Sequence, residues 1–341
     1  MYAHLPQLGA QNPTTNRRML FTSACAVLML ALGGVFQTAF AADAAGPFLG
    51  NWDLTIPGGG AGWLGVTEKD GKLQAVILWG GGSVVPVEIA KVEDDRLVLT
   101  RDLTSNPQTI TAQVQGDTLN LTISHAGEDG KNIQQDFTGK RTPSLPPAPD
   151  LSKVKYGEPI ALLNGKDLSG WKLIDPQQAN GWSAQDGVLG NRIEQEQGKP
   201  HKSFGNLRTE KEFEDFNLTL ETRVPKKGNS GVYLRGIYEV QVFDSFGHQL
   251  NPHNMGAIYS RVCPTVAAEK PAGEWQKMDI TLVDRHVTVI LNGTKIIDNQ
   301  PVEGCTGGAL WSDQLRPGPI YLQGDHTGIE YRNIVLRPVV K

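Results

Sequence analysis

The sequence predicts an all-β protein, and three observations carry that prediction. The chain of 341 residues contains 39 glycines, and long apolar runs with helical periodicity are few. Its apolar residues instead alternate with polar ones over short runs, as in half-buried strands. Turn residues such as Asn292-Gly293, a strong two-residue hairpin signal, separate those runs. The length is enough for about two domains.

The first residues predict a cleaved signal peptide, residues 1–41. Arg17-Arg18 precede an apolar core over residues 19–35, and Ala39-Phe40-Ala41 fits the small-x-small cleavage pattern. We therefore expect a periplasmic or secreted protein with no membrane span after signal removal; a retained anchor is the alternative. Charged residues make up 20% of the chain and the net charge is -4, which argues against a nucleic-acid partner.

A proline-rich segment divides the rest of the chain. Residues 142–150 contain four prolines, which favours an extended linker, placed at residues 142–155. Before it, residues 46–141 show about eight short alternating runs in succession, which predict a small up-and-down β-barrel. A Gly-x-Trp start at Gly50 and the Phe137-Thr138-Gly139-Lys140 ending are similar to a reduced lipocalin-like barrel. No catalytic set is found there, so we expect a role in attachment, recognition or shielding.

Residues 156–341 predict two antiparallel sheets packed face to face, with a ligand groove on one concave face. Between residues 217 and 244 the strands alternate an apolar face with a polar one. Because successive strand side chains point to opposite faces, one shared polar face is expected. Its expected members are Glu221, Arg223, Arg235, Glu239 and Gln241, with tyrosine close by.

Two cysteines remain after signal removal, Cys263 and Cys305. In an oxidising compartment an even pair predicts a disulfide. Closing a loop of roughly 40 residues would stabilise the fold by about 4 kcal/mol. The alternative is two unpaired buried thiols.

Nine short motifs are spread in order over the second part of the chain. They are LNGKDLSGW at 163–171, DFNLTLE at 215–221, GNSGVYLR at 228–235, YEVQVFD at 238–244, GAIY at 256–259, KPAGEW at 270–275, NG at 292–293, QGDH at 323–326 and EYRNI at 330–334. With these motifs, residues 159–338 resemble the 3-keto-disaccharide hydrolase family. The resemblance implies a concanavalin-like jelly roll acting on glycosides whose sugar is oxidised to a ketone at carbon 3, by elimination (a lyase) or net hydrolysis.

A ketone at carbon 3 acidifies the hydrogen on carbon 2, so the reaction needs a base there and an electrophile near the carbonyl oxygen. Glu239 or His326 could be the base, and Arg235 or Arg223 could stabilise the enolate. A divalent cation held by Glu221, Glu239 and His326 could take the place of the arginine. The residues expected to bind substrate hydroxyls are Glu221, Arg223, Tyr233, Gln241, Asp244 and Gln323.

Structural roles are the alternative for each of these residues. Glu221 and Arg223 could form ion pairs on a solvated face, and Arg235 with Glu239 a structural salt bridge. Asp244 and His326 could serve only in turns. The alternatives for the function are a non-catalytic carbohydrate-binding module and an ordinary glycosidase that uses Glu221 and Glu239. The residues leave the sugar, the aglycone and the oligomeric state open.

Overall fold

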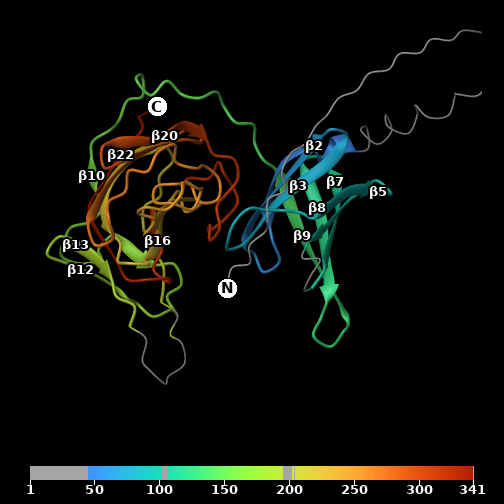
Figure 1. Cartoon of the computed structure of the whole chain (residues 1–341), viewed down its shortest axis with the longest axis horizontal. Coiled ribbons are helices and arrows are strands. Elements are labelled where there is room, and N and C mark those ends of the chain that lie inside the picture. The colour runs from blue at the N-terminus through green and yellow to red at the C-terminus, as the bar shows by residue number, and fades with distance from the viewer. Residues whose placement is uncertain (1–44, 102–105, 195–201, 203, 341) are drawn as a thin grey trace, which may run out of the picture.

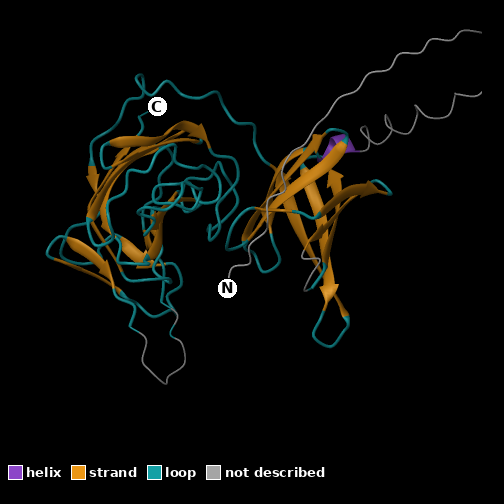
Figure 2. Cartoon of the chain, viewed as in Figure 1, coloured by secondary structure: helices purple, strands orange, loops and turns teal. Residues whose placement is uncertain are grey.

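The structure is a computed structural model that describes residues 45–101, 106–194, 202 and 204–340. The predicted signal peptide therefore lies outside the described residues. The described residues are built almost wholly of strands and loops, and among them is one short 3-10 helix, η1 (Gly46–Phe48) (Figure 2). The all-β prediction is confirmed. None of the described helices has the length and apolar character that crossing a membrane requires.

The first body of the chain is a nine-stranded antiparallel sheet, seen in blue and cyan-green in Figure 1. Its strand order is β4-β3-β2-β1-β9-β8-β7-β6-β5, and β3 also contacts β5, so the sheet curls back on itself. The strands are β1 (Gly50–Thr55), β2 (Ala61–Lys69), β3 (Lys72–Trp79), β4 (Val85–Pro86), β5 (Ile89–Glu93), β6 (Arg96–Arg101), β7 (Gln108–Gln115), β8 (Thr118–Ala126) and β9 (Asn132–Arg141).

Alternation explains how this sheet builds a core. In β8, Leu119, Leu121 and Ile123 are buried, and the residues between them are more exposed. The same face carries Trp52 and Leu54 of β1, so one continuous apolar cluster fills the interior. This arrangement is the small barrel that the succession of short runs predicts.

Residues 142–155 leave the barrel in an extended path that includes no strand. They lie along the second body, seen as the long green segment at the top of Figure 1. Arg285 donates to the carbonyl of Ser144, and Nδ2 of Asn299 donates to the carbonyl of Pro149 at 2.9 Å.

The second body contains two sheets that enclose one large apolar core. The eight-stranded sheet has the order β12-β13-β22-β15-β18-β19-β20, with β10 beside β22, and the five-stranded sheet has the order β11-β14-β21-β16-β17. The strands are β10 (Ile160–Ala161), β11 (Trp171–Leu173), β12 (Trp182–Gln185), β13 (Val188–Asn191), β14 (Leu207–Thr209), β15 (Phe216–Arg223), β16 (Asn229–Leu234), β17 (Tyr238–Phe243), β18 (Trp275–Val283), β19 (His286–Leu291), β20 (Thr294–Pro301), β21 (Tyr321–Leu322) and β22 (Ile329–Pro338).

The alternating pattern of β15 is confirmed, but its expected partners are wrong. Phe216, Leu218 and Leu220 are buried in the core. β15 pairs with β18 and β22, whereas β16 and β17 belong to the opposite sheet. Two sheets that pack face to face bury their apolar sides against each other, so their polar sides point in opposite directions. The polar residues of β15 therefore cannot share a face with those of β17.

Candidate active site

A cavity of about 280 Å³ opens on the side of the five-stranded sheet that faces away from the sandwich core. It combines residues of three neighbouring strands with several loops. Most of its lining is polar or aromatic. The lining residues are Gly81, Gly82, Asn206, Asn229, Tyr233, Glu239, Gln241, Tyr259, Gly307, Gly308, Tyr321, Gln323, Asp325 and His326.

Strand register places an acid and two phenols side by side in this cavity. Tyr233 of β16 is directly opposite Glu239 of β17 on one side and Tyr321 of β21 on the other. The rings of Tyr233 and Tyr321 stack with centroids 4.0 Å apart. The neighbouring core-facing residues, Val232 and Val240, are fully buried, so alternation fixes the three polar side chains on the opposite face.

Glu239 is almost completely buried, with 4% of its surface exposed. Its Oε2 lies 2.9 Å from the hydroxyl of Tyr233, and that hydroxyl is also 2.7 Å from the carbonyl of Gly307. Burial raises the pKa of Glu239 to about 8, although the hydrogen bond from Tyr233 and the charge of His326 act to lower it. Glu239 is therefore mostly a neutral carboxylic acid at pH 7, able to donate a proton.

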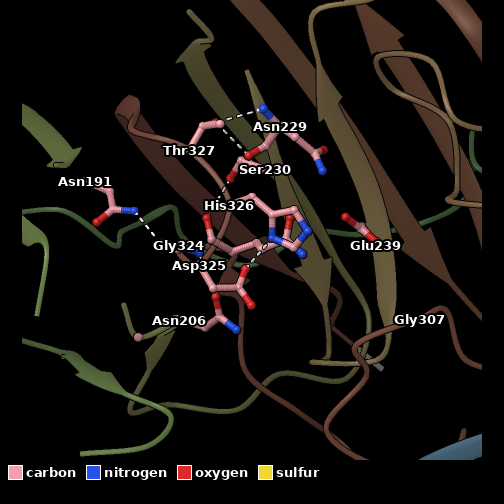
Figure 3. Close-up of polar contacts among 12 residues, drawn as sticks. Asn191, Asn206, Asn229, Ser230, Glu239, Gly307, Gly324, Asp325, His326 and Thr327 are labelled. Carbon is pink, nitrogen blue, oxygen red and sulfur yellow. Dashed lines mark hydrogen bonds and ion pairs between the residues drawn. The ribbon is translucent and has the colours of Figure 1, made fainter. Parts of the chain in front are cut away.

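The loop that follows β21 brings His326 into the same cavity. Two hydrogen bonds hold this loop against β16. The backbone N–H of Gln323 donates to the carbonyl of Gly231 at 3.0 Å, and the side-chain Oγ1 of Thr327 accepts from the backbone N–H of Asn229 at 2.8 Å. Gly324 is required in the loop, since a Cβ there would lie 2.7 Å from the carbonyl oxygen of Gly205. Figure 3 shows His326 and Glu239 pointing toward the same space from different elements.

Asp325 orients the His326 ring. The Asp325 Oδ1 lies 2.6 Å from Nδ1 of His326 (Figure 3). That hydrogen bond raises the pKa of His326 above its ordinary value, against the effect of burial. Burial acts to raise the pKa of Asp325, but the hydrogen bond and the charge of His326 hold that pKa below its usual value. With Nδ1–H committed to Asp325, the neutral ring carries its lone pair on Nε2.

Two amide oxygens in the cavity wall have no protein donor. Oε1 of Gln241 and Oε1 of Gln323 are buried and lack a hydrogen-bond partner among the described residues. The amide nitrogen of Gln241 donates to Oδ1 of Asn229 at 3.4 Å, so the end of this amide that lacks a partner is its acceptor, Oε1. A buried oxygen without a donor costs stability, and a ligand rich in hydroxyl groups would supply the missing donors.

Arg235 lies outside the cavity, which corrects the expectation that it shares a face with Glu239. β16 ends at Leu234, and Arg235 begins the turn to β17 with a φ of 55°. This left-handed conformation breaks the strand alternation on which the expectation rested. The guanidinium donates to the carbonyls of Gln314, at 2.6 Å, and Arg316, at 2.7 Å. Arg235 thus holds a loop, and no ion pair joins it to Glu239 in the described structure.

Glu221 and Arg223 lie on the outer face of the other sheet. Glu221 accepts from Nη2 of Arg332 at 2.6 Å, and Arg223 forms an ion pair with Glu330. These are the cross-strand pairs expected of a solvated face. Asp244 accepts from the backbone N–H of Lys227 at 2.8 Å, and so stabilises the β16–β17 end of the sheet without lining the cavity.

The predicted disulfide is wrong for this structure, in which Cys263 and Cys305 are both free. Cys305 is fully buried, with its Sγ 3.7 Å from the carbonyl of Gly62 in the barrel, whereas Cys263 is exposed on the sandwich. One thiol faces the barrel and the other faces solvent.

The three-residue metal site suggested by the sequence is not formed either, because Glu221 belongs to the sheet opposite Glu239 and His326. Within the described ranges no group of three or more His, Cys, Asp or Glu side chains is arranged to hold a metal ion. The residues therefore support no cation site of the kind predicted.

A larger hollow of about 730 Å³ lies beside β12 and β13. Its walls include the ion pair of Arg223 with Glu330 and the exposed carboxylate of Asp186. Its lining contains no histidine, whereas the smaller cavity combines the buried carboxyl of Glu239 with the imidazole of His326. The smaller cavity is therefore the candidate active site.

Comparison with known proteins assigns the second body to a family. Residues 158–337, just over half of the chain, match the profile of the 3-keto-alpha-glucoside-1,2-lyase-like domain. The chain belongs to this family. The resemblance inferred from the sequence motifs is thereby confirmed.

Relatives of this lyase-like domain include a curated protein of Bacteroides thetaiotaomicron named 3-keto-disaccharide hydrolase, 24% identical over 188 residues. The match covers 46% of this chain and 60% of that relative. Among solved structures, two proteins of Parabacteroides distasonis provisionally described as glycosyl hydrolases are similar. One is 29% identical, covering 57% of this chain and 94% of the other at a TM-score of 0.43; the second is 22% identical, covering 53% and 94% at 0.45.

The lyase-like domain contains most of the cavity, and sequence reasoning missed several of its residues. Asp325 lies beside His326 in the QGDH motif and could have been assigned from that adjacency. Asn206 and Tyr321 carry no signal in the sequence, since only the fold brings them to the site. Gly81 and Gly82 come from the barrel, outside the family match.

Proposed function

We propose that this protein cleaves the glycosidic bond of 3-keto-glycosides by removing the proton on carbon 2. The observation that carries the proposal is the pairing in one cavity of a neutral buried acid, Glu239, with an imidazole oriented by a carboxylate, His326 with Asp325. Membership of the lyase-like family and the name of the Bacteroides relative support the same chemistry.

His326 is the proposed base. Its Nε2 takes the proton from carbon 2, and the electrons of that C–H bond form the carbon 2–carbon 3 double bond of an enolate. Glu239, a neutral acid with a pKa of about 8, donates a hydrogen bond or its proton to the developing enolate oxygen. A neutral acid in a low-dielectric cavity replaces the arginine that the sequence suggested for this role.

Collapse of the enolate then breaks the bond between carbon 1 and the glycosidic oxygen. The electron pair leaves with that oxygen, which takes up a proton to give the free alcohol. The other product is a ketone with a double bond between carbons 1 and 2, and addition of water across this bond completes a net hydrolysis. Glu239 and the imidazolium of His326 both line the cavity and can supply that proton.

Gln241 and Gln323 are proposed to bind the sugar. Their unpartnered Oε1 atoms accept from hydroxyl groups, which every hexose ring presents around its edge. Tyr233 and Tyr321 beside them stack on each other and are almost completely buried, so they support this wall of the cavity and present no open ring face to the sugar.

The decisive experiment uses 4-nitrophenyl 3-keto-glucoside and its unoxidised parent. We expect release of nitrophenol from the oxidised compound alone, and exchange of the carbon-2 hydrogen in deuterated water. His326→Gln should abolish that exchange, whereas Glu239→Gln, which keeps a hydrogen-bond donor, should slow it by at least ~100-fold without removing it. Cleavage of the parent alone would instead support an ordinary glycosidase, and binding without cleavage would support a carbohydrate-binding module.

The export of the enzyme is also a proposal, resting on the Arg17-Arg18 pair and the apolar residues 19–35. Amino-terminal sequencing of protein secreted or recovered from the periplasm of the source cell should begin close after Ala41. An intact amino terminus on membrane-bound protein would contradict it.

A further inference from the structure

We infer that the amino-terminal barrel is part of the substrate site, and that its glycine loop sets how large a sugar the cavity accepts. The inference rests on the proposed function, because the cavity concerned is the one around Glu239 and His326. Gly81 and Gly82, in the loop between β3 and β4, line that cavity. Every other lining residue belongs to the lyase-like domain.

Hydrogen bonds hold this barrel loop to the rim of the cavity on two sides. Ser83 Oγ lies 2.9 Å from Nε2 of His253 and 3.3 Å from the hydroxyl of Tyr259. The backbone N–H of Val84 donates to Oγ of Ser260 at 2.9 Å. On the other side, Gly308 donates its backbone N–H to the carbonyl of Gly80 at 3.2 Å.

The barrel surface behind the loop is packed into the sandwich. Trp63, together with Ala61 and Leu78, belongs to the apolar core of the sandwich and not to the core of the barrel. The guanidinium of Arg261 lies 4.2 Å from the Trp63 ring centroid, and a Cβ at Gly304 would lie 2.4 Å from Trp63 Cδ1. Because apolar burial of this kind opposes separation, the loop is a fixed wall of the cavity.

Glycines allow the barrel loop to lie directly against the backbone of the lyase-like domain. A Cβ on Gly307 would lie 2.0 Å from the carbonyl oxygen of Gly82, so two backbones meet there without side chains. The wall then presents peptide N–H and C=O groups, which suit hydroxyls. The resulting cavity of about 280 Å³ is just below the roughly 300–1,000 Å³ range of ligand pockets. It therefore suits a mono- or disaccharide, and the barrel excludes longer glycans.

Gly81 offers a direct test, because a side chain can be added there without strain. Its φ is not positive, and a Cβ would meet nothing within 4 Å. We expect Gly81→Phe to raise the KM for 4-nitrophenyl 3-keto-glucoside, and the Kd for 3-keto-glucose measured by calorimetry, about tenfold or more. Gly46→Phe, at an exposed glycine of the barrel with the same open surroundings, is the matched control and should change neither constant.

Ser83→Ala supplies a second variant that adds no bulk. Losing the contacts to His253 and Tyr259 should loosen the wall and raise KM several-fold, with kcat almost unchanged. Unaltered Kd and KM in both Gly81→Phe and Ser83→Ala would overturn the inference. Wild-type protein that binds 3-keto-glucose but cleaves nothing would overturn the proposed reaction only, because the calorimetric comparison of the variants still tests the wall. Wild-type protein that neither binds nor cleaves would overturn both.

Discussion

The hydroxyl oxygen of Tyr233 lies 2.9 Å from Oε2 of Glu239, on the directly opposite strand. Tyr233 has one proton to donate and two acceptors within reach, Glu239 and the carbonyl of Gly307. While Glu239 is neutral, the Tyr233 hydroxyl donates to the carbonyl of Gly307, which leaves the Glu239 proton available for a substrate oxygen. When Glu239 ionises, the Tyr233 hydroxyl turns to the carboxylate. The pair thus stays satisfied in both protonation states.

Tyr233→Phe should raise the pKa of Glu239 above about 8, because a hydrogen bond to a carboxylate is stronger than one to the neutral acid. The basic limb of the pH dependence of kcat/KM should therefore move to higher pH, with a rate loss of ~10–100-fold. The measurement is a pH–rate profile on the 3-keto-glucoside. A basic limb at the same pH as in the wild-type protein would show that Glu239 is not the group that titrates there.

Asp325→Asn should lower the pKa of His326 toward its ordinary value, since the hydrogen bond to Asp325 is the largest cause of its rise. His326 then stays unprotonated down to a lower pH, so the acidic limb of the pH–rate profile should move to lower pH. Loss of the ring's orientation should slow the reaction ~10-fold or more. Asp244→Asn, a loop carboxylate outside the cavity, serves as the control. An acidic limb that does not move would assign it to another group.

Gly231→Ala should displace Glu239, because an added Cβ would lie 2.2 Å from its Oε1. We expect kcat to fall by ~100-fold, as for loss of the acid itself. Gly190→Ala, also on a strand of the sandwich, is the matched control, since a Cβ there meets nothing within 4 Å. The measurement is kcat for both variants, after thermal unfolding has shown that each is folded. Full activity in Gly231→Ala would show that the position of Glu239 is unimportant.

Asp53 makes the barrel–sandwich contact sensitive to pH. It accepts from Thr142 Oγ1 and from Gln314 Nε2 of the sandwich, and burial raises its pKa from 3.8 to about 6. The folded state holds this proton more tightly than the unfolded state, so the contribution of Asp53 to the free energy of unfolding falls as pH rises from about 4 to about 6. A carboxylate in a salt bridge has the opposite effect, because its contribution to the free energy of unfolding grows as pH rises.

Asp53→Asn keeps the two acceptor contacts and removes the charge. We expect the variant to match the wild-type protein near pH 4 and to be more stable by ~1–3 kcal/mol near pH 7.5, where two pKa units correspond to about 2.7 kcal/mol. Denaturant unfolding at the two pH values measures this. Asp117→Asn, at a highly exposed carboxylate of the barrel, is the control. A variant less stable than the wild-type protein at pH 7.5 would show that the Asp53 charge holds the bodies together.

The sequence by itself determined the class of the fold and the faces of single strands. Phe216, Leu218 and Leu220 alternate with polar residues because a strand has a period of two, and this local rule holds in any sheet. It also placed Tyr233, Glu239 and Gln241 together, since the hairpin that joins β16 and β17 is short enough to fix their register.

Only the tertiary structure decided which sheet each strand joins and which loops complete the cavity. Glu221 and Glu239 read alike along the chain, yet one faces solvent beside Arg332 and the other is buried beside Tyr233. Arg235 does not lie on the polar face, because its own left-handed backbone conformation in the turn breaks the strand alternation. The contact of Gly82 with Gly307 joins residues more than 200 positions apart. Such pairings depend on how whole apolar surfaces pack, and no local pattern records that.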